Sequence, residues 1–150
     1  MQTTQVNPFK ALVFSTQATL SELGQHVGSV ARQLHADAVA NRLDIVGPIQ
    51  WIYEGMDGNP HTRFNLTIAL PVSGQPSGET AFKCQTLPTF KCIWLIHHGP
   101  WNQMHIPYSQ LFQQALSHQM TPSSISRELY IHVDFENAEN NITLIQLGIL

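Results

Sequence analysis

The sequence predicts an α+β fold built from two tandem β-α-β-β units, because one register repeats along the chain at the constant offset that separates Tyr53 from Tyr130. This offset places similar residues of the two halves in equivalent positions: Tyr53 and Tyr130, Asp57 and Asp134, Leu34 and Leu111, Ala38 and Ala115, and the apolar segments 68–72 and 145–149. No gap is needed across one predicted helix and two predicted strands. Two related units predict an antiparallel sheet with two helices and a ligand cleft between the repeats.

The composition agrees with this prediction. Of the 150 residues, 43% are hydrophobic and 9% are aromatic, which is enough to build the core of a single domain over residues 1–150. We place repeat 1 at about residues 9–72 and repeat 2 at about residues 81–150. A linker rich in Gly, Pro and Ser, at about residues 73–80, joins them.

The first repeat begins with a strand and a helix. The apolar, aromatic segment 9–14 predicts the strand, and only about eight residues precede it. Thr19 and Glu22 have the spacing of a capping box at a helix start. The helix is predicted to end near Leu43. One apolar stripe defines its buried face: Leu23, Val27, Val30, Leu34 and Ala38.

The remaining elements follow the same order. In repeat 2 the extended stretch 82–97 is expected to be interrupted or bent near Pro88. Pro107 fits the first turn of the helix, or a kink if the helix starts earlier at Trp101. The other predicted elements are a hairpin of strands 49–53 and 64–72 around the turn 57–60, a helix with Tyr108, Leu111, Phe112, Ala115 and Leu116 on its apolar side, and a closing hairpin of strands 127–133 and 142–149.

Charge and sequence signals exclude several classes of partner. The seven Lys and Arg residues are scattered and the formal net charge is −3, so no direct nucleic-acid partner is expected. The chain has no signal peptide and no run of about 20 apolar residues, so we expect a cytoplasmic protein without a membrane partner. Cys84 and Cys92 fit no zinc motif and are expected to be reduced thiols. The histidines lack ligand spacing and no phosphate-binding glycine loop is present, so neither a metal nor another cofactor is expected.

Several short segments, taken in order, resemble one known family. The segments are Leu87-Pro88-Thr89-Phe90 leading to His97-His98-Gly99-Pro100-Trp101, Arg127-Glu128-Leu129-Tyr130, Thr143 to Ile149, and Leu70-Pro71-Val72. Over roughly residues 9–150 the chain resembles the GyrI-like family. That family comprises effector-binding domains of multidrug-sensing transcription activators, gyrase-inhibitor-like proteins, and members proposed to hydrolyse small strained-ring toxins. The resemblance implies a bacterial protein with a tandem β-α-β-β fold and a pseudo-twofold cleft for amphipathic or cationic ligands.

The sequence departs from the family pattern in two places. No helix-turn-helix precedes the first predicted strand, so we expect a stand-alone member that binds no operator by that route. Many relatives carry an acid just after the threonine of the last strand, where this chain has Leu144. We therefore expect one central carboxylate in the cleft instead of two.

Glu128 is the strongest candidate for a functional carboxylate. Strand alternation puts Glu128 on one face with Tyr130 and His132, and this face is expected to line the cleft. The opposite face is aliphatic and is expected to pack against the helices; it carries Leu129, Ile131 and Val133. Burial among aromatic rings would raise the pKa of the Glu128 carboxyl, which could pair with a cationic ligand or act as a general acid/base. The alternative is a carboxylate paired with a neighbouring Lys or Arg on a solvated sheet face.

Aromatic residues near Glu128 are the other candidates for ligand contacts. The repeat offset makes Trp51 the counterpart of Glu128, and Tyr53 the counterpart of Tyr130. Aromatic rings attract cations by about 0.5–2 kcal/mol per contact. The predicted ligand-binding set is Trp51, Tyr53, Trp94, Trp101, Tyr108, Glu128 and Tyr130. The alternative for each ring is ordinary packing in the core.

The sequence leaves three functions open. The first is a stand-alone protein that binds small amphipathic or cationic, drug-like or toxin-like molecules in the aromatic cleft. The second is a hydrolase of small reactive toxins in which Glu128 is the catalytic general acid/base. The third is a gyrase-inhibitor-like interaction module whose protein partner the sequence does not identify.

Overall fold

The computed structural model describes residues 2–26 and 29–150. Its strands are β1 (Gln2–Val6), β2 (Phe9–Ala18), β3 (Asp44–Ile45), β4 (Gln50–Glu54), β5 (Phe64–Ser73), β6 (Lys83–Leu87), β7 (Phe90–His98), β8 (Pro122–His132) and β9 (Ile142–Ile149). Its helices are α1 (Ser29–Ala40) and α2 (His105–Ser117), with short 3₁₀ segments at η1 (Leu20–Gln25), η2 (Trp101–Gln103) and η3 (Ala138–Asn140). Among the described residues, no helix combines the length and the apolar character needed to cross a bilayer.

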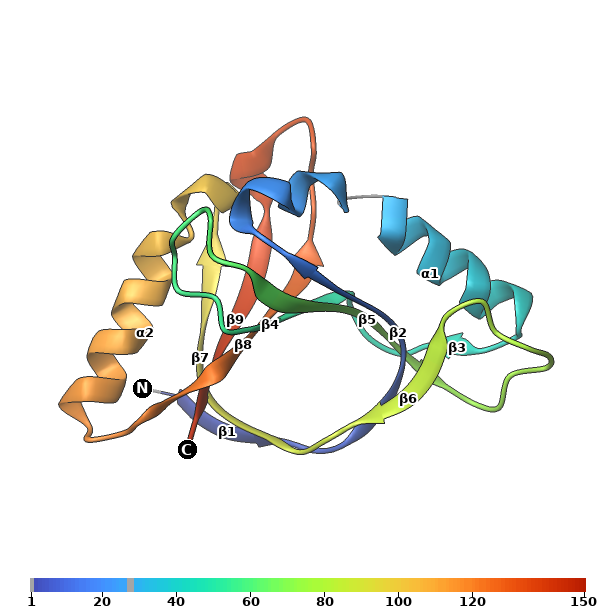
Figure 1. Cartoon of the computed structure of the whole chain (residues 1–150), viewed down its shortest axis with the longest axis horizontal. Coiled ribbons are helices and arrows are strands. Elements are labelled where there is room, and N and C mark those ends of the chain that lie inside the picture. Colours follow the sequence, from blue (N-terminus) through green and yellow to red (C-terminus); the bar gives the residue numbers. More distant parts are fainter. Residues whose placement is uncertain (1, 27–28) are drawn as a thin grey trace.

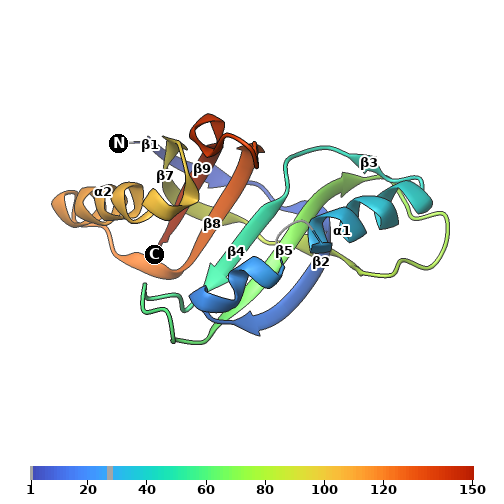
Figure 2. The same ribbon diagram turned by 90° about the horizontal axis from the view of Figure 1, so that it is seen from above.

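The strands form one curved antiparallel sheet, with both helices on the same face (Figures 1 and 2). Their order is β1-β7-β9-β8-β4-β5-β2-β6. The short strand β3 stands outside this order and pairs with β5. In each unit the helix packs on the outer part of the sheet, α1 over β2 and β5 and α2 over β7 and β9. The predicted α+β architecture, with an antiparallel sheet and two helices, is therefore confirmed.

A pseudo-twofold axis passes through the centre of the sheet, where β4 pairs with β8. Trp51 lies directly opposite Glu128 in this pair, and the repeat offset relates these two positions. The same offset relates the neighbouring ladders, since Trp51 pairs with Ile68 on β5 and Glu128 pairs with Ile145 on β9. Trp51 and Glu128 are thus equivalent positions that meet at the axis.

The first strands of the two units follow a different offset. Leu12 on β2 pairs with Leu70, and Ile93 on β7 pairs with Leu147. Leu70 and Leu147 are related by the repeat offset, so Leu12 and Ile93 are equivalent although their separation in the sequence is larger. The constant offset therefore holds for the later elements of each unit but not for the first strands, because the second unit has fewer residues between its first strand and the elements that follow.

Two long arms cross on the side of the sheet opposite the helices (Figure 1). Arm 1 is β1–β2 and arm 2 is β6–β7, and they pair in one antiparallel register across residues 2–13 and 83–94. This register puts Pro8 opposite Pro88, and the ladder is interrupted there because proline has no amide hydrogen to donate. The interruption near Pro88 agrees with the prediction from the sequence. The strand β1 was not predicted, because its residues are mostly polar.

The predicted helix of the first unit is two elements in the structure. η1 and α1 are separate, and α1 ends before Leu43. The predicted capping box is wrong, because the Thr19 side chain makes no cap hydrogen bond and its hydroxyl lies 2.9 Å from that of Ser21. Val27 lies outside the described residues. The other members of the stripe that fall in α1 are buried as predicted: Val30, Leu34 and Ala38.

The face of β8 that turns towards the helices also differs from the prediction. Glu128 and Tyr130 lie on the helix side, where they line a cavity with residues of α1 and α2. Ile131, on the other face, is 51% exposed. The aliphatic residues that pack under the helices come from the flanking strands instead, with Ile68 under α1 and Ile145 under α2. The centre of the sheet is thereby left free for polar side chains.

Candidate functional site

A cavity of about 1280 Å³ lies between α1 and α2, with the central strands β4 and β8 as its floor. Its volume exceeds the roughly 300–1,000 Å³ of common small-molecule sites, so an organic ligand of drug size would fit. Apolar side chains dominate its walls: Leu20, Leu23, Ile49, Trp51, Met56, Trp101, Met104, Phe112 and Phe135. The site is therefore a large apolar cleft between the two units.

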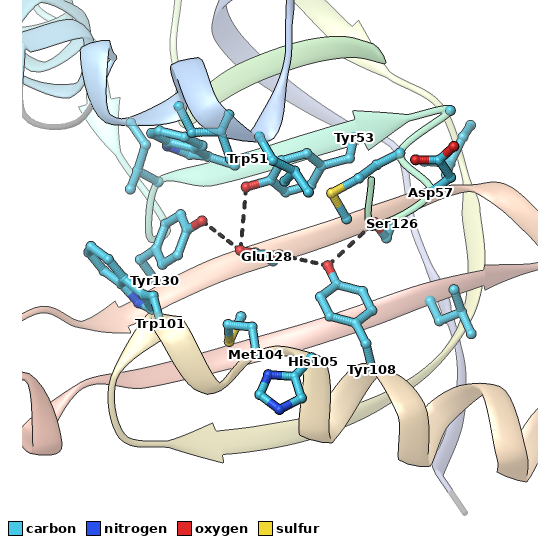
Figure 3. Close-up of a pocket in the computed structure, with 18 of the residues that line it drawn as sticks. Trp51, Tyr53, Asp57, Trp101, Met104, His105, Tyr108, Ser126, Glu128 and Tyr130 are labelled. Atoms are coloured by element: carbon cyan, nitrogen blue, oxygen red, sulfur yellow. Dashed lines mark hydrogen bonds between the residues drawn. The ribbon is translucent and has the colours of Figure 1, made fainter. Parts of the chain in front are cut away.

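The carboxyl group of Glu128 lies at the floor of this cleft, and the residue is 7% exposed. Three tyrosine hydroxyls donate hydrogen bonds to it (Figure 3). Tyr108 reaches Oε2 at 2.7 Å and Tyr130 reaches Oε1 at 2.8 Å, while Tyr53 lies 3.4 Å from Oε1. Groups from both units therefore fix the orientation of one buried carboxyl.

Strand register and helix placement bring these four residues together. Tyr53 lies opposite Ser126 on β8, two positions from Glu128 on the same face of that strand. Tyr130 follows Glu128 by two residues on that face. Tyr108 lies in the first turn of α2, where Pro107 is tolerated as predicted, and its hydroxyl is also 3.4 Å from Ser126 Oγ.

Burial controls the ionisation of this cluster. It raises the pKa of Glu128 above the ordinary carboxyl value, because the charged form loses its water. The hydrogen bonds from the three tyrosines and the nearby His97 act in the opposite direction but do not cancel the rise. Burial, and then the Glu128 charge, raise the pKa of each tyrosine well above its ordinary value. The hydroxyls therefore keep their protons and remain hydrogen-bond donors near neutral pH.

Glu128 is expected to lower the stability of the fold as the pH rises. A carboxyl whose pKa is higher in the folded than in the unfolded state binds its proton more tightly when folded, so its contribution to the free energy of unfolding falls as the pH increases from the unfolded pKa through the folded pKa. Glu128→Gln has no carboxyl at this position to ionise. As the pH rises over this range, the unfolding free energy of the wild-type protein should therefore fall relative to that of the variant. Urea unfolding between about pH 4 and about pH 8 measures it. A difference that is independent of pH would contradict the raised pKa.

A row of edge-to-face aromatic contacts forms one wall of the cleft. The Trp51 and Tyr130 ring centroids are 5.9 Å apart, those of Tyr130 and Trp101 are 5.4 Å apart, and those of Trp101 and Phe135 are 6.2 Å apart. The Trp101 indole N–H donates to Thr143 Oγ1 at 3.3 Å, which fixes this ring against β9. The hydroxyl of Tyr130 thus meets Glu128 while its ring belongs to the aromatic wall.

The structure brings together six of the seven residues that the sequence singled out: Trp51, Tyr53, Trp101, Tyr108, Glu128 and Tyr130 all line the cavity. Trp94 does not. It pairs with Gln146 on β9, on the face of the sheet that turns away from the helices. The prediction that Trp94 lies in the cleft is therefore wrong. Successive residues of β7 alternate between the two faces of the sheet, and Ile93 and Leu95 are the ones that face α2.

Several lining residues were missed by the sequence analysis. Met104 and Phe135 come from loops, where no periodicity indicates which way a side chain points. Phe112 was assigned to the apolar side of its helix, and it reaches the cleft while remaining 49% exposed. Asp57 adds a second carboxylate at the rim, so Glu128 shares the cavity with another acidic residue. Within residues 2–26 and 29–150, no three His, Cys, Asp or Glu side chains gather as possible metal ligands.

Comparison with known proteins identifies the fold. No family model and no curated protein matches the sequence. The C-terminal domain of EcmrR is similar with a TM-score of 0.77 and 16% identity, covering 99% of this chain and 96% of that one. A hydrolase encoded by lin2189 from Listeria innocua is similar with a TM-score of 0.73 and 13% identity, over 99% and 91% of the two chains. SAV2435 bound to tetraphenylphosphonium is similar with a TM-score of 0.63 and 13% identity, over 99% and 93%.

These likenesses extend over almost the whole chain and include one protein with a bound ligand. Their identities are low, so what they establish is the architecture. The architecture agrees with the fold that the resemblance in the sequence implied. The chain has the GyrI-like fold.

Proposed function

We propose that this protein binds small amphipathic organic cations in the cleft between its two units, with Glu128 as the partner of the positive charge. The observation that carries this proposal is a buried carboxyl at the floor of a large apolar cavity. An organic cation offers apolar surface to the walls and a charge to Glu128. A neutral ligand would leave that carboxyl without a charged partner, and burial alone makes its ionised form costly.

The hydrogen bonds of Glu128 narrow the class of cation. A carboxylate offers about four lone-pair sites. Oε1 faces two tyrosine hydroxyls and Oε2 faces one, so about one site is left for a ligand. A guanidinium or a primary ammonium brings several N–H donors and would have to displace tyrosines. A quaternary cation, or a tertiary amine with a single N–H, needs only the charge and the aromatic wall.

The similarity to SAV2435 bound to tetraphenylphosphonium supports this class of ligand, since that compound carries a permanent charge surrounded by aromatic groups. In the present chain, Trp51, Trp101 and Tyr130 offer rings beside Glu128. Stacking and cation–π contacts with such rings are worth about 0.5–2 kcal/mol each. Charge and shape thus favour the same kind of molecule.

Thermal unfolding with a matched pair of compounds tests the proposal. Tetraphenylphosphonium should stabilise the protein, by about 2.7 kcal/mol at 100 times its dissociation constant. Triphenylphosphine oxide has similar rings without a charge, and we expect it to stabilise the protein much less. Equal stabilisation by the two compounds would show that the cleft recognises aromatic surface alone, and no stabilisation by either would contradict binding.

A second candidate is hydrolysis, for which the raised pKa of Glu128 is the specific observation. Because burial raises the pKa of Glu128, its carboxyl keeps the proton to a higher pH than an ordinary carboxyl does. The protonated form can donate a proton to a leaving group, and its conjugate base can activate water. If the protein turns over strained-ring or ester compounds, Glu128→Gln should lower the rate by about 10²–10⁴-fold with little change in affinity. Product formation by the wild-type protein is the measurement. An absence of turnover with compounds that bind in the cleft would exclude this candidate.

A further inference from the structure

A second buried charge lies on the opposite face of the same strand. Arg127 precedes Glu128 on β8, so its side chain points away from the cleft and towards the two arms. It is 3% exposed. Its guanidinium carbon lies 4.1 Å from the ring centroid of Phe90 and 5.9 Å from that of Phe9. These rings come from equivalent positions of the two arms, related by the same offset as Leu12 and Ile93.

Among the described residues, no acidic side chain forms an ion pair with Arg127. The ion pair that the structure shows for these residues joins Arg63 and Glu22, away from Arg127. Burial lowers the pKa of Arg127 to about 10, which still leaves the guanidinium protonated near neutral pH. Burial raises the pKa of the neighbouring Cys92 thiol to about 11, so this group is neutral at the same pH. The arms therefore enclose a net positive charge.

Two of the three guanidinium nitrogens of Arg127 are also without a hydrogen-bond partner among the described residues. The Phe rings attract the positive charge of the guanidinium. The face of an aromatic ring is only a weak hydrogen-bond acceptor, so the rings do not replace the hydrogen bonds that the N–H groups need. Nε and Nη1 are buried and have no hydrogen-bond partner among the described residues. Buried polar groups in native proteins nearly always have a partner in the protein, an ordered water or an ion. The environment of Arg127 thus calls for an acceptor, and preferably a charged one.

Two buried carboxamides lie on the same face of the sheet. Gln146 pairs with Arg127 across β8 and β9 and is 6% exposed. Gln50 is the counterpart of Arg127 in the first unit, is 6% exposed, and has an unpartnered Oε1. The oxygen and nitrogen of a carboxamide exchange places by a half-turn of the group. Such a half-turn of Gln50 places an N–H donor where its unpartnered oxygen lies.

We propose that Arg127 binds one small monovalent inorganic anion, such as chloride, through its unpartnered N–H groups, with help from the carboxamides of Gln50 and Gln146. A water molecule would satisfy the hydrogen bonds but would leave the buried charge uncompensated. A carboxylate ligand or a phosphate is larger and needs more donors than this cluster offers. The site lies on the face opposite the cleft and is independent of ligand binding there.

Unfolding in two sodium salts tests this site. At constant ionic strength, replacing gluconate with chloride should raise the folding equilibrium constant of the wild-type protein along a saturable curve, by about tenfold when chloride reaches ten times its dissociation constant. Arg127→Met removes the charge but keeps much of the side-chain length, and it should abolish the difference between the salts. Arg63→Met removes an exposed guanidinium and should retain it.

A second measurement avoids any loss of folding in the Arg127 variant. Crystals of the wild-type protein grown or soaked in bromide should show an anomalous peak beside the Arg127 guanidinium. The same stability in chloride and gluconate, or an equal chloride effect in Arg127→Met, would overturn the proposal. So would bromide crystals without this peak, which would leave water as the partner of Arg127.

Discussion

Glu128→Gln is expected to weaken the binding of tetraphenylphosphonium by about 3 kcal/mol, on the order of 10²-fold. The substitution preserves the size of the side chain and its ability to accept hydrogen bonds from Tyr130 and Tyr53. It removes the charge, so the bound cation would lie in an apolar cavity without a counter-charge. Isothermal titration calorimetry measures the change in affinity.

Two comparisons make this result specific. Glu54→Gln removes a carboxylate from the exposed end of β4, on the neighbouring strand, and should leave the affinity unchanged. Triphenylphosphine oxide should bind the wild-type protein and Glu128→Gln with similar affinities, because it carries no charge for Glu128 to pair with. If Glu128→Gln and Glu54→Gln bind the cation equally well, the central carboxyl does not recognise the charge of the ligand.

Gly148→Ala is expected to lower the free energy of unfolding by about 3 kcal/mol. A β-carbon at this position of β9 would overlap Ser123 Oγ and would lie 2.7 Å from the Ile125 carbonyl oxygen and 2.9 Å from the Phe90 ring. β8 makes its register shift between Pro122 and Ser126, and this irregularity brings its backbone against Gly148. Backbone atoms cannot move aside as easily as a flexible side chain, so the strain would displace the strand that carries Glu128.

Gly24→Ala is the matched control for this substitution. Gly24 lies in η1, where an added β-carbon meets nothing within 4 Å, and its backbone does not need the left-handed conformation. The free energy of unfolding of Gly24→Ala should stay within about 0.5 kcal/mol of the wild-type value. Urea unfolding of both variants measures the two effects. Equal stabilities would contradict the close approach of β8 and β9 at Gly148.

The centre of the site could be predicted because it depends on two simple periodicities. Strand alternation places Glu128 and Tyr130 on one face, and the repeat offset makes Trp51 and Tyr53 their counterparts. The antiparallel pairing of β4 with β8 then brings these positions together at the pseudo-twofold axis. Periodicity and internal repetition are properties of the sequence, so this part of the fold needed no tertiary information.

The remaining features depend on contacts that the sequence does not display. Alternation shows which residues of β7 share a face, but not which face α2 covers, so Trp94 was placed on the wrong side. The polar segment of β1 forms a strand through its pairing with β7, and its own residues do not indicate this pairing. The burial of Arg127 depends on the arms, whose crossing at Pro8 and Pro88 follows from a long-range register.

Proton release on binding tests most directly whether the cleft recognises cations through ionised Glu128. Tetraphenylphosphonium is titrated into the protein in buffers of different ionisation enthalpy, at several pH values around and above the ordinary carboxyl pKa. Because burial raises the pKa of Glu128, the free protein carries this proton over part of the range, and a bound cation should expel it. The account predicts release of up to about one proton by the wild-type protein, decreasing to none at higher pH. It predicts no release by Glu128→Gln. Tight binding of the cation without proton release at any pH, or equal release by the variant, would contradict the account.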